Sequence, residues 1–70
     1  MTVLEDTRVM KTRLPLDPAG LDRRMDDFLE GVKKAIQEAR KIYPPGQYKL
    51  CEIGFMPGGS FIEINLYFQR

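Results

Sequence analysis

Apolar and polar residues alternate through the last third of the chain, residues 48–70, in the manner of two β-strands. Pro57-Gly58-Gly59-Ser60 lies between them and predicts a hairpin turn. A turn centred on the two glycines brings three pairs of apolar side chains together on one face: Phe55 with Ile62, Ile53 with Ile64 and Cys51 with Leu66. We therefore expect this face to form the core, with Cys51 as a buried structural thiol.

The other face of the predicted hairpin mixes apolar, aromatic and polar side chains. Its members are Tyr48, Leu50, Glu52, Met56, Phe61, Glu63, Asn65 and Tyr67. Such a face is too apolar for a fully solvated sheet and too polar for a core. Aromatic side chains around a few polar groups are typical of protein interfaces, so these residues are the candidate binding residues.

An amphipathic helix is predicted between Asp17, a good N-cap, and the Tyr43-Pro44-Pro45-Gly46 segment that ends it. Pro18 occupies the first helical position, where its missing N–H is tolerated. Apolar residues recur at steps of three and four: Leu21, Met25, Phe28, Leu29, Val32, Ala35, Ile36, Ala39 and Ile42. Acids in the first half and bases in the second complement the helix dipole. Gly31, at the edge of this stripe, is interpreted as a tolerated weak point in preference to a close backbone contact.

Residues 6–14 are strand-like, with Met10, Thr12 and Leu14 on one side and Val9, Lys11 and Arg13 on the other. Pro15 suits the end of a strand, and residues 1–5 are expected to be a loose end. The order strand, helix, strand, strand predicts one α+β domain over residues 1–70, with the helix packed on one face of a three-stranded sheet that ends in a β-hairpin. If the first strand lies parallel to the second, the helix is a right-handed crossover between them.

Composition narrows the function further. The chain has 70 residues, 11 Lys and Arg against 10 Asp and Glu, one cysteine and no histidine. A net charge of +1 gives no global field for nucleic acid or a membrane surface, and no apolar run reaches the length of a membrane span. Glu5 and Asp6 interrupt the N-terminal residues, so no signal peptide is predicted and the cytoplasm is the expected compartment.

No combination of residues predicts catalysis or a cofactor. Cys51 has no histidine to activate it, and the glycine-rich turn lacks the Lys-Ser/Thr of a phosphate loop. Glu52 and Glu63 lie one cross-strand step apart in the predicted pairing, which could serve general acid–base chemistry or hold a cation. A polar surface patch is the favoured interpretation of these two carboxylates, so neither an enzyme nor a metal protein is expected.

The strand–helix–strand–strand order in a chain of this size resembles the dodecins, small flavin-binding proteins that assemble into hollow shells. The resemblance covers the element order alone, and the tryptophan that stacks on flavin in that family has no counterpart here. It implies an alternative function, an oligomeric carrier of a flavin-like aromatic ligand that uses Tyr48, Leu50, Phe61 and Tyr67. The favoured expectation is a non-enzymatic protein-binding module, an adaptor or inhibitor of cellular, viral or mobile-element origin that acts through the mixed sheet face. A chain this small without disulfides often gains stability by self-association, so a homo-oligomer is also expected.

Overall fold

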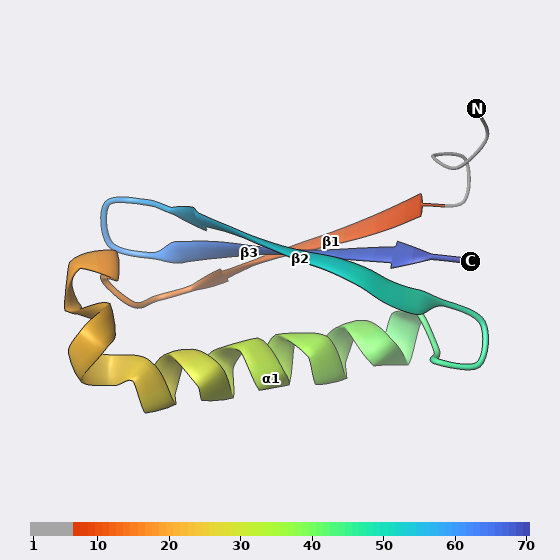
Figure 1. Ribbon diagram of the computed structural model, residues 1–70, viewed down its shortest axis with the longest axis horizontal. Coiled ribbons are helices and arrows are strands. Elements are labelled where there is room, and N and C mark those ends of the chain that lie inside the picture. Colours follow the sequence, from red (N-terminus) through yellow and green to blue (C-terminus); the bar gives the residue numbers. More distant parts are fainter. Residues whose placement is uncertain (1–6) are drawn as a thin grey trace.

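The computed structural model describes residues 7–70 and has the predicted two-layer α+β architecture (Figure 1). Its elements are β1 (Thr7–Leu14), the short 3₁₀ helix η2 (Pro18–Arg24), α1 (Met25–Ile42), β2 (Lys49–Pro57) and β3 (Ile62–Gln69). Figure 1 shows α1 along one side of the sheet, while no described element covers the other side. The loose end predicted for residues 1–5 lies outside the described residues.

β3 is the central strand of the sheet, in the order β1-β3-β2, and both neighbours run antiparallel to it. β1 and β2 therefore point in the same direction, but β3 separates them. α1 connects these two strands, which are parallel to each other but not adjacent. The sequence interpretation allowed for a parallel pair with a helix between them, but it did not anticipate β3 in the middle of the sheet. β1 and β2 are the two edge strands of the sheet.

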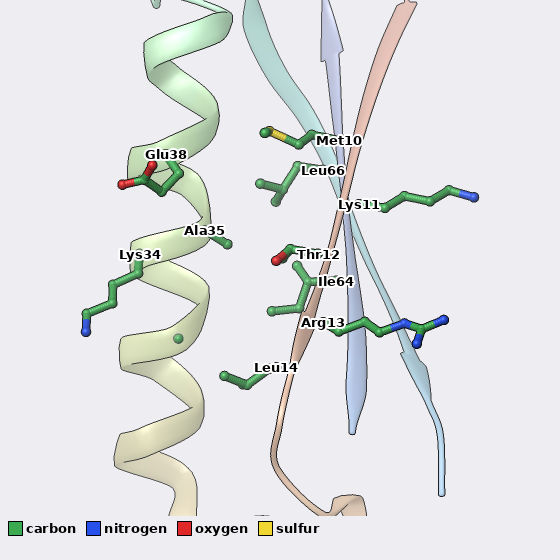
Figure 2. Close-up of a pocket in the computed structure, with 11 residues that line it drawn as sticks. Met10, Lys11, Thr12, Arg13, Leu14, Lys34, Ala35, Glu38, Ile64 and Leu66 are labelled. Carbon is green, nitrogen blue, oxygen red and sulfur yellow. The ribbon is translucent and has the colours of Figure 1, made fainter. Parts of the chain in front are cut away.

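The faces predicted for the first strand are confirmed. Met10, Thr12 and Leu14 lie opposite Leu66, Ile64 and Ile62 of β3, and their side chains point toward α1 (Figure 2). Lys11 and Arg13 project from the other side of the sheet.

The helical segment starts and ends where the sequence predicts, but it contains a break. The Asp17 side chain caps the start by accepting a hydrogen bond from the Ala19 N–H at 2.9 Å. The first seven residues form the 3₁₀ helix, and its last residue, Arg24, has a non-helical backbone, at φ −125° and ψ 34°, just before α1 begins. Gly20 has low α-helical propensity, which favours the tighter helix in this first segment.

The core lies between α1 and the centre of the sheet. The buried apolar residues are Leu16, Ala39, Ile62, Ile64, Leu66 and Phe68. The apolar stripe of the helix is wider than this contact, because α1 lies over β1 and β3. Leu29 therefore remains 56% exposed and Ile42 57% exposed.

Gly31 makes the close contact that the sequence interpretation did not favour. A Cβ atom placed on Gly31 would lie 2.5 Å from Leu14 Cδ1 and 3.2 Å from Leu14 Cγ. The glycine thus allows α1 to approach β1, and its cost in helix propensity is offset by packing.

The predicted register of the hairpin is wrong by two residues. Phe55 pairs with Ile64 and Ile53 with Leu66, so Phe55 does not face Ile62. The reason is the position of the turn: the Gly58 N–H donates to the Phe61 carbonyl at 2.8 Å, so that Gly59 and Ser60 form its centre. Because the shift is an even number of residues, Ile53 and Phe55 keep the face predicted for them.

A β-bulge at Cys51 overturns the prediction for the start of β2. Leu50 pairs with Phe68 and Glu52 with Tyr67, so Cys51 is the extra residue and has no partner on β3. The thiol is exposed, in contrast to the buried position predicted, and donates to the Tyr67 carbonyl at 3.2 Å. An extra residue reverses the alternation before it, which moves Leu50 to the face covered by α1.

Tyr48 also lies on the core side and not on the mixed face. Its ring contacts that of Tyr43 at a centroid distance of 5.1 Å, and Tyr43 in turn contacts the buried Phe68 at 5.2 Å. The Arg40 guanidinium donates to the Tyr48 carbonyl at 2.9 Å. These contacts hold the entry to β2 against the end of α1, so the bulge is needed to bring the strand back into phase.

Candidate interaction surface

The side of the sheet that α1 leaves uncovered is the candidate interaction surface, here called the open face. Its residues alternate with those of the core along all three strands: Val9, Lys11, Arg13, Glu52, Gly54, Met56, Glu63, Asn65 and Tyr67. Val9 is 41% exposed and Met56 is 58% exposed, so apolar side chains meet solvent beside charged ones. The open face thus combines apolar and charged groups on a rigid support.

Most of the predicted binding residues lie on this face or at its border. The structure places Glu52, Met56, Glu63, Asn65 and Tyr67 on it. The Phe61 ring lies at its end, where the Arg13 guanidinium stacks on it at 4.6 Å from the centroid. Tyr48 and Leu50 belong to the core side, as described above. The pocket expected for an aromatic ligand is therefore not assembled, because Tyr48 and Tyr67 lie on opposite sides of the sheet.

Asn65 occupies the centre of the open face, between Lys11 on β1 and Gly54 on β2. It is only 8% exposed, although no helix covers this side. Its Oδ1 atom is buried and accepts no hydrogen bond from any described residue. A methyl group placed on Gly54 would lie 3.6 Å from the Tyr67 ring and 3.9 Å from Asn65 Cβ, so the ring leans over the glycine beside the amide.

Charges on the open face are divided by strand. Lys11 and Arg13 come from β1, whereas Glu63 comes from β3 and Glu52 from β2. The side-chain ion pairs within residues 7–70 join Arg24 to Asp27 and Lys41 to Glu38, so these four charges of the open face are not engaged in one. The β1 side of the surface is therefore basic and the β2 side acidic.

The two glutamates are farther apart than the predicted register placed them. Glu52 lies opposite Tyr67, four residues along β3 from Glu63, which pairs with Met56. At about 3.3 Å per residue this separation is roughly 13 Å, too far for one proton or one cation to be shared. The carboxylate pair considered from the sequence is not formed.

A groove between α1 and the edge strand β1 is a feature that the sequence did not reveal (Figure 2). It has a volume of about 280 Å³. Met10, Thr12, Leu14, Ile64 and Leu66 line it from the sheet, and Gly31, Lys34, Ala35 and Glu38 line it from the helix. The two small residues of α1 leave it unfilled, and Thr12 is exposed although it points toward the helix.

A second groove, lined by apolar residues alone, lies beside β2. Its volume is about 340 Å³, and Pro18, Leu21, Phe28, Phe55, Pro57 and Ile62 line it. The rings of Phe28 and Phe55 are in contact at 5.3 Å, yet Phe55 remains 48% exposed. An exposed phenylalanine on the helix side of an edge strand is a further feature that the sequence interpretation, which had Phe55 in the core, did not expect.

Within residues 7–70, no cluster of His, Cys, Asp and Glu side chains could hold a metal ion. No helix in this part of the chain is both long enough and apolar enough to cross a membrane.

Comparison of the chain with protein-family models, with curated proteins and with solved structures found no match.

Proposed function

We propose that this protein is a non-enzymatic binding module whose open face docks a protein partner. The observation that carries the proposal is the unsatisfied amide oxygen of Asn65 at the centre of that face. Leaving a buried acceptor without a donor costs about 1–3 kcal/mol, so the position is costly in the isolated chain. A donor from a partner removes that cost on binding.

The surroundings of Asn65 suit a protein ligand. Met56 and Val9 offer apolar contact, and the Tyr67 ring offers both an apolar face and a hydroxyl. Basic side chains lie on the β1 side of the open face and acidic ones on the β2 side, and this charge asymmetry would fix the orientation of a partner. The proposed class is an adaptor or inhibitor working in the cytoplasm, a location that fractionation of the source cells tests.

The experiment compares three substitutions on the 70-residue chain. Asn65→Val removes the unsatisfied oxygen and suits a strand, so it should raise the free energy of unfolding by about 1 kcal/mol in urea titrations. The same substitution should weaken capture of the partner at least tenfold, because the partner's donor is then left unpaired. Tyr67→Glu should weaken capture as well, and Lys33→Glu, on the solvent side of α1, should not.

The partner is identified first by photo-crosslinking from a reactive residue at Met56, with one at Lys33 as the matched control. A specific band from Met56 that is missing from Lys33 supports docking on the open face. If Asn65→Val stabilises the chain and leaves capture unchanged, the amide has no part in binding and the proposal is wrong.

A further inference from the structure

The sheet ends in two different edges, and each carries a feature that the other lacks. β1 is regular from Thr7 to Leu14, and the unfilled groove runs along its helix side. From Val9 to Arg13, its outer side makes no backbone hydrogen bond to any other described element. β2 presents the half-exposed ring of Phe55 on its helix side and Glu52 on its open side.

Pairing the same edge strand of two copies is unfavourable. Pairing β1 with β1 of a second copy would bring Lys11 and Arg13 of both chains together on one face, and like charges on adjacent strands are destabilising. Pairing β2 with β2 would leave both β1 edges and both grooves uncovered. Neither arrangement matches the basic edge with the acidic one.

Opposite edges are complementary in charge and shape. Because β1 and β2 point in the same direction, a second copy that continues the sheet with its helix on the same side lays its β2 parallel to β1. Side chains then alternate in step: Glu52 arrives on the side of Lys11 and Arg13, and Phe55 arrives on the side of Thr12 and Leu14. Thr12 is where the groove opens to solvent, so the exposed ring meets an unfilled apolar space.

The same arrangement also covers exposed apolar side chains on the β2 side of the molecule. Leu29 is two residues from Gly31, hence about 200° around the helix axis, and lies on the flank of α1 away from β1. Leu29 and Phe55 are 56% and 48% exposed. A neighbouring chain seated on the β2 edge would cover both, which an isolated chain does not.

We infer that copies of this chain assemble head to tail, with β2 of one copy added to β1 of the next and Phe55 inserted into the groove between α1 and β1. This inference does not depend on the docking proposed at Asn65, because it uses the edges of the sheet, with Lys11 and Glu52 at the margins of the open face, and leaves Asn65 at the centre of that face free. Head-to-tail contacts generate a ring when the rotation closes, and a ring removes every free edge. We expect a single closed species larger than a dimer.

The test uses two variants, each with one edge disabled. Thr12→Glu places a carboxylate at the mouth of the groove, and Phe55→Glu replaces the ring on β2 with a carboxylate. Both native side chains are exposed, so the circular dichroism spectrum of each variant should match that of the wild type. By light scattering and native mass spectrometry the wild type should be the closed oligomer and each variant alone a monomer. An equimolar mixture should give a dimer and nothing larger, since it contains one intact pair of edges.

Each other outcome overturns the inference. A monomeric wild type removes the assembly itself. A dimer of Phe55→Glu alone indicates β1 with β1, and a dimer of Thr12→Glu alone indicates β2 with β2. A mixture that remains monomeric, or variants that keep the wild-type mass, place the contact away from these edges.

A charge exchange provides a second, milder measurement. Lys11→Glu and Glu52→Lys should each weaken assembly roughly fivefold at low salt, as expected for a partly exposed pair. The double variant should recover to within about twofold of the wild type, because every head-to-tail interface then holds the pair in reversed order. Additive weakening in the double variant would contradict the proposed pairing. Asn65→Val, the variant that tests the open face, should leave the mass unchanged, so the two proposals can fail separately.

Discussion

Gly31 decides how near the helix comes to the edge of the sheet. The Leu14 side chain occupies the space where a Cβ atom would lie, with Cδ1 at 2.5 Å and Cγ at 3.2 Å from that position. The absence of a side chain at Gly31, together with the small Ala35, also leaves the groove beside β1 open. One residue therefore serves both the packing of α1 and the shape of the proposed binding groove.

A double-mutant cycle measures this contact. Gly31→Ala gains about 1 kcal/mol of helix propensity but forces Leu14 to move, so its net effect on the free energy of unfolding should be small or unfavourable. In a Leu14→Ala background the space is free and the same substitution should stabilise the chain. We expect Gly31→Ala to be more favourable there by at least about 1 kcal/mol in urea titrations. Equal effects in both backgrounds would show that Gly31 and Leu14 are not in contact.

At the scale of elements, the sequence defined the helix and the strands better than their pairing. The helix, its cap at Asp17 and the alternation of β1 are local patterns, and the structure confirms them, although Leu29 and Ile42 of the helix stripe stay exposed. The register of the hairpin depends on which two residues form the turn, and Gly58-Gly59 and Gly59-Ser60 are both acceptable to the local rules. The bulge at Cys51 cannot be recognised from the sequence either, because Leu50 and Glu52 are also compatible with a strand that has no bulge.

The bulge also explains why the candidate surface was only partly predicted. Residues after Cys51 kept their assigned side, so Glu52, Met56 and Asn65 were correctly grouped. Tyr48, before it, was assigned to the wrong side, because the aromatic contacts that retain it involve Tyr43 and Phe68, far away in the sequence. The groove beside β1 depends on the approach of α1, which no pattern within a single element describes.

Deleting Cys51 tests whether the bulge is required. Without the extra residue, either Tyr48 and Leu50 move to the open face or the later residues of β2 do, because a one-residue slip exchanges the faces. Removing Leu50 from its partly buried site alone should cost about 2 kcal/mol or more of the free energy of unfolding. Cys51→Ala is the matched control: it keeps the bulge, loses only an exposed thiol contact and should change stability by less than about 1 kcal/mol. A deletion variant as stable as this control would mean that the strand tolerates either phase.

At the scale of the whole molecule, the fold leaves several large apolar side chains exposed, and the proposed assembly would cover Leu29 and Phe55 among them. Only one side of the sheet is packed, and the buried cluster within residues 7–70 consists of Ile64, Leu66 and Phe68 of β3 with Ala39 of α1. Met25 and Leu29 of α1 and Phe55 of β2 stay exposed, outside that cluster. Stability that depends on covering them must depend on the concentration of the chain.

The melting temperature should therefore rise with protein concentration. For a closed oligomer, each tenfold dilution removes about 1 kcal/mol of stabilisation per chain, which for a domain of this size lowers the melting temperature by roughly 4–8 °C. Phe55→Glu, confined to the monomer, should melt at a lower temperature that does not change on dilution. Added salt should lower the wild-type value only slightly, because the apolar contact of Phe55 is not screened as the pair of Lys11 and Glu52 is. Scanning calorimetry over a hundredfold concentration range decides the matter: a wild-type melting temperature that stays constant would show that one chain is stable alone, with Phe55 and Leu29 in water.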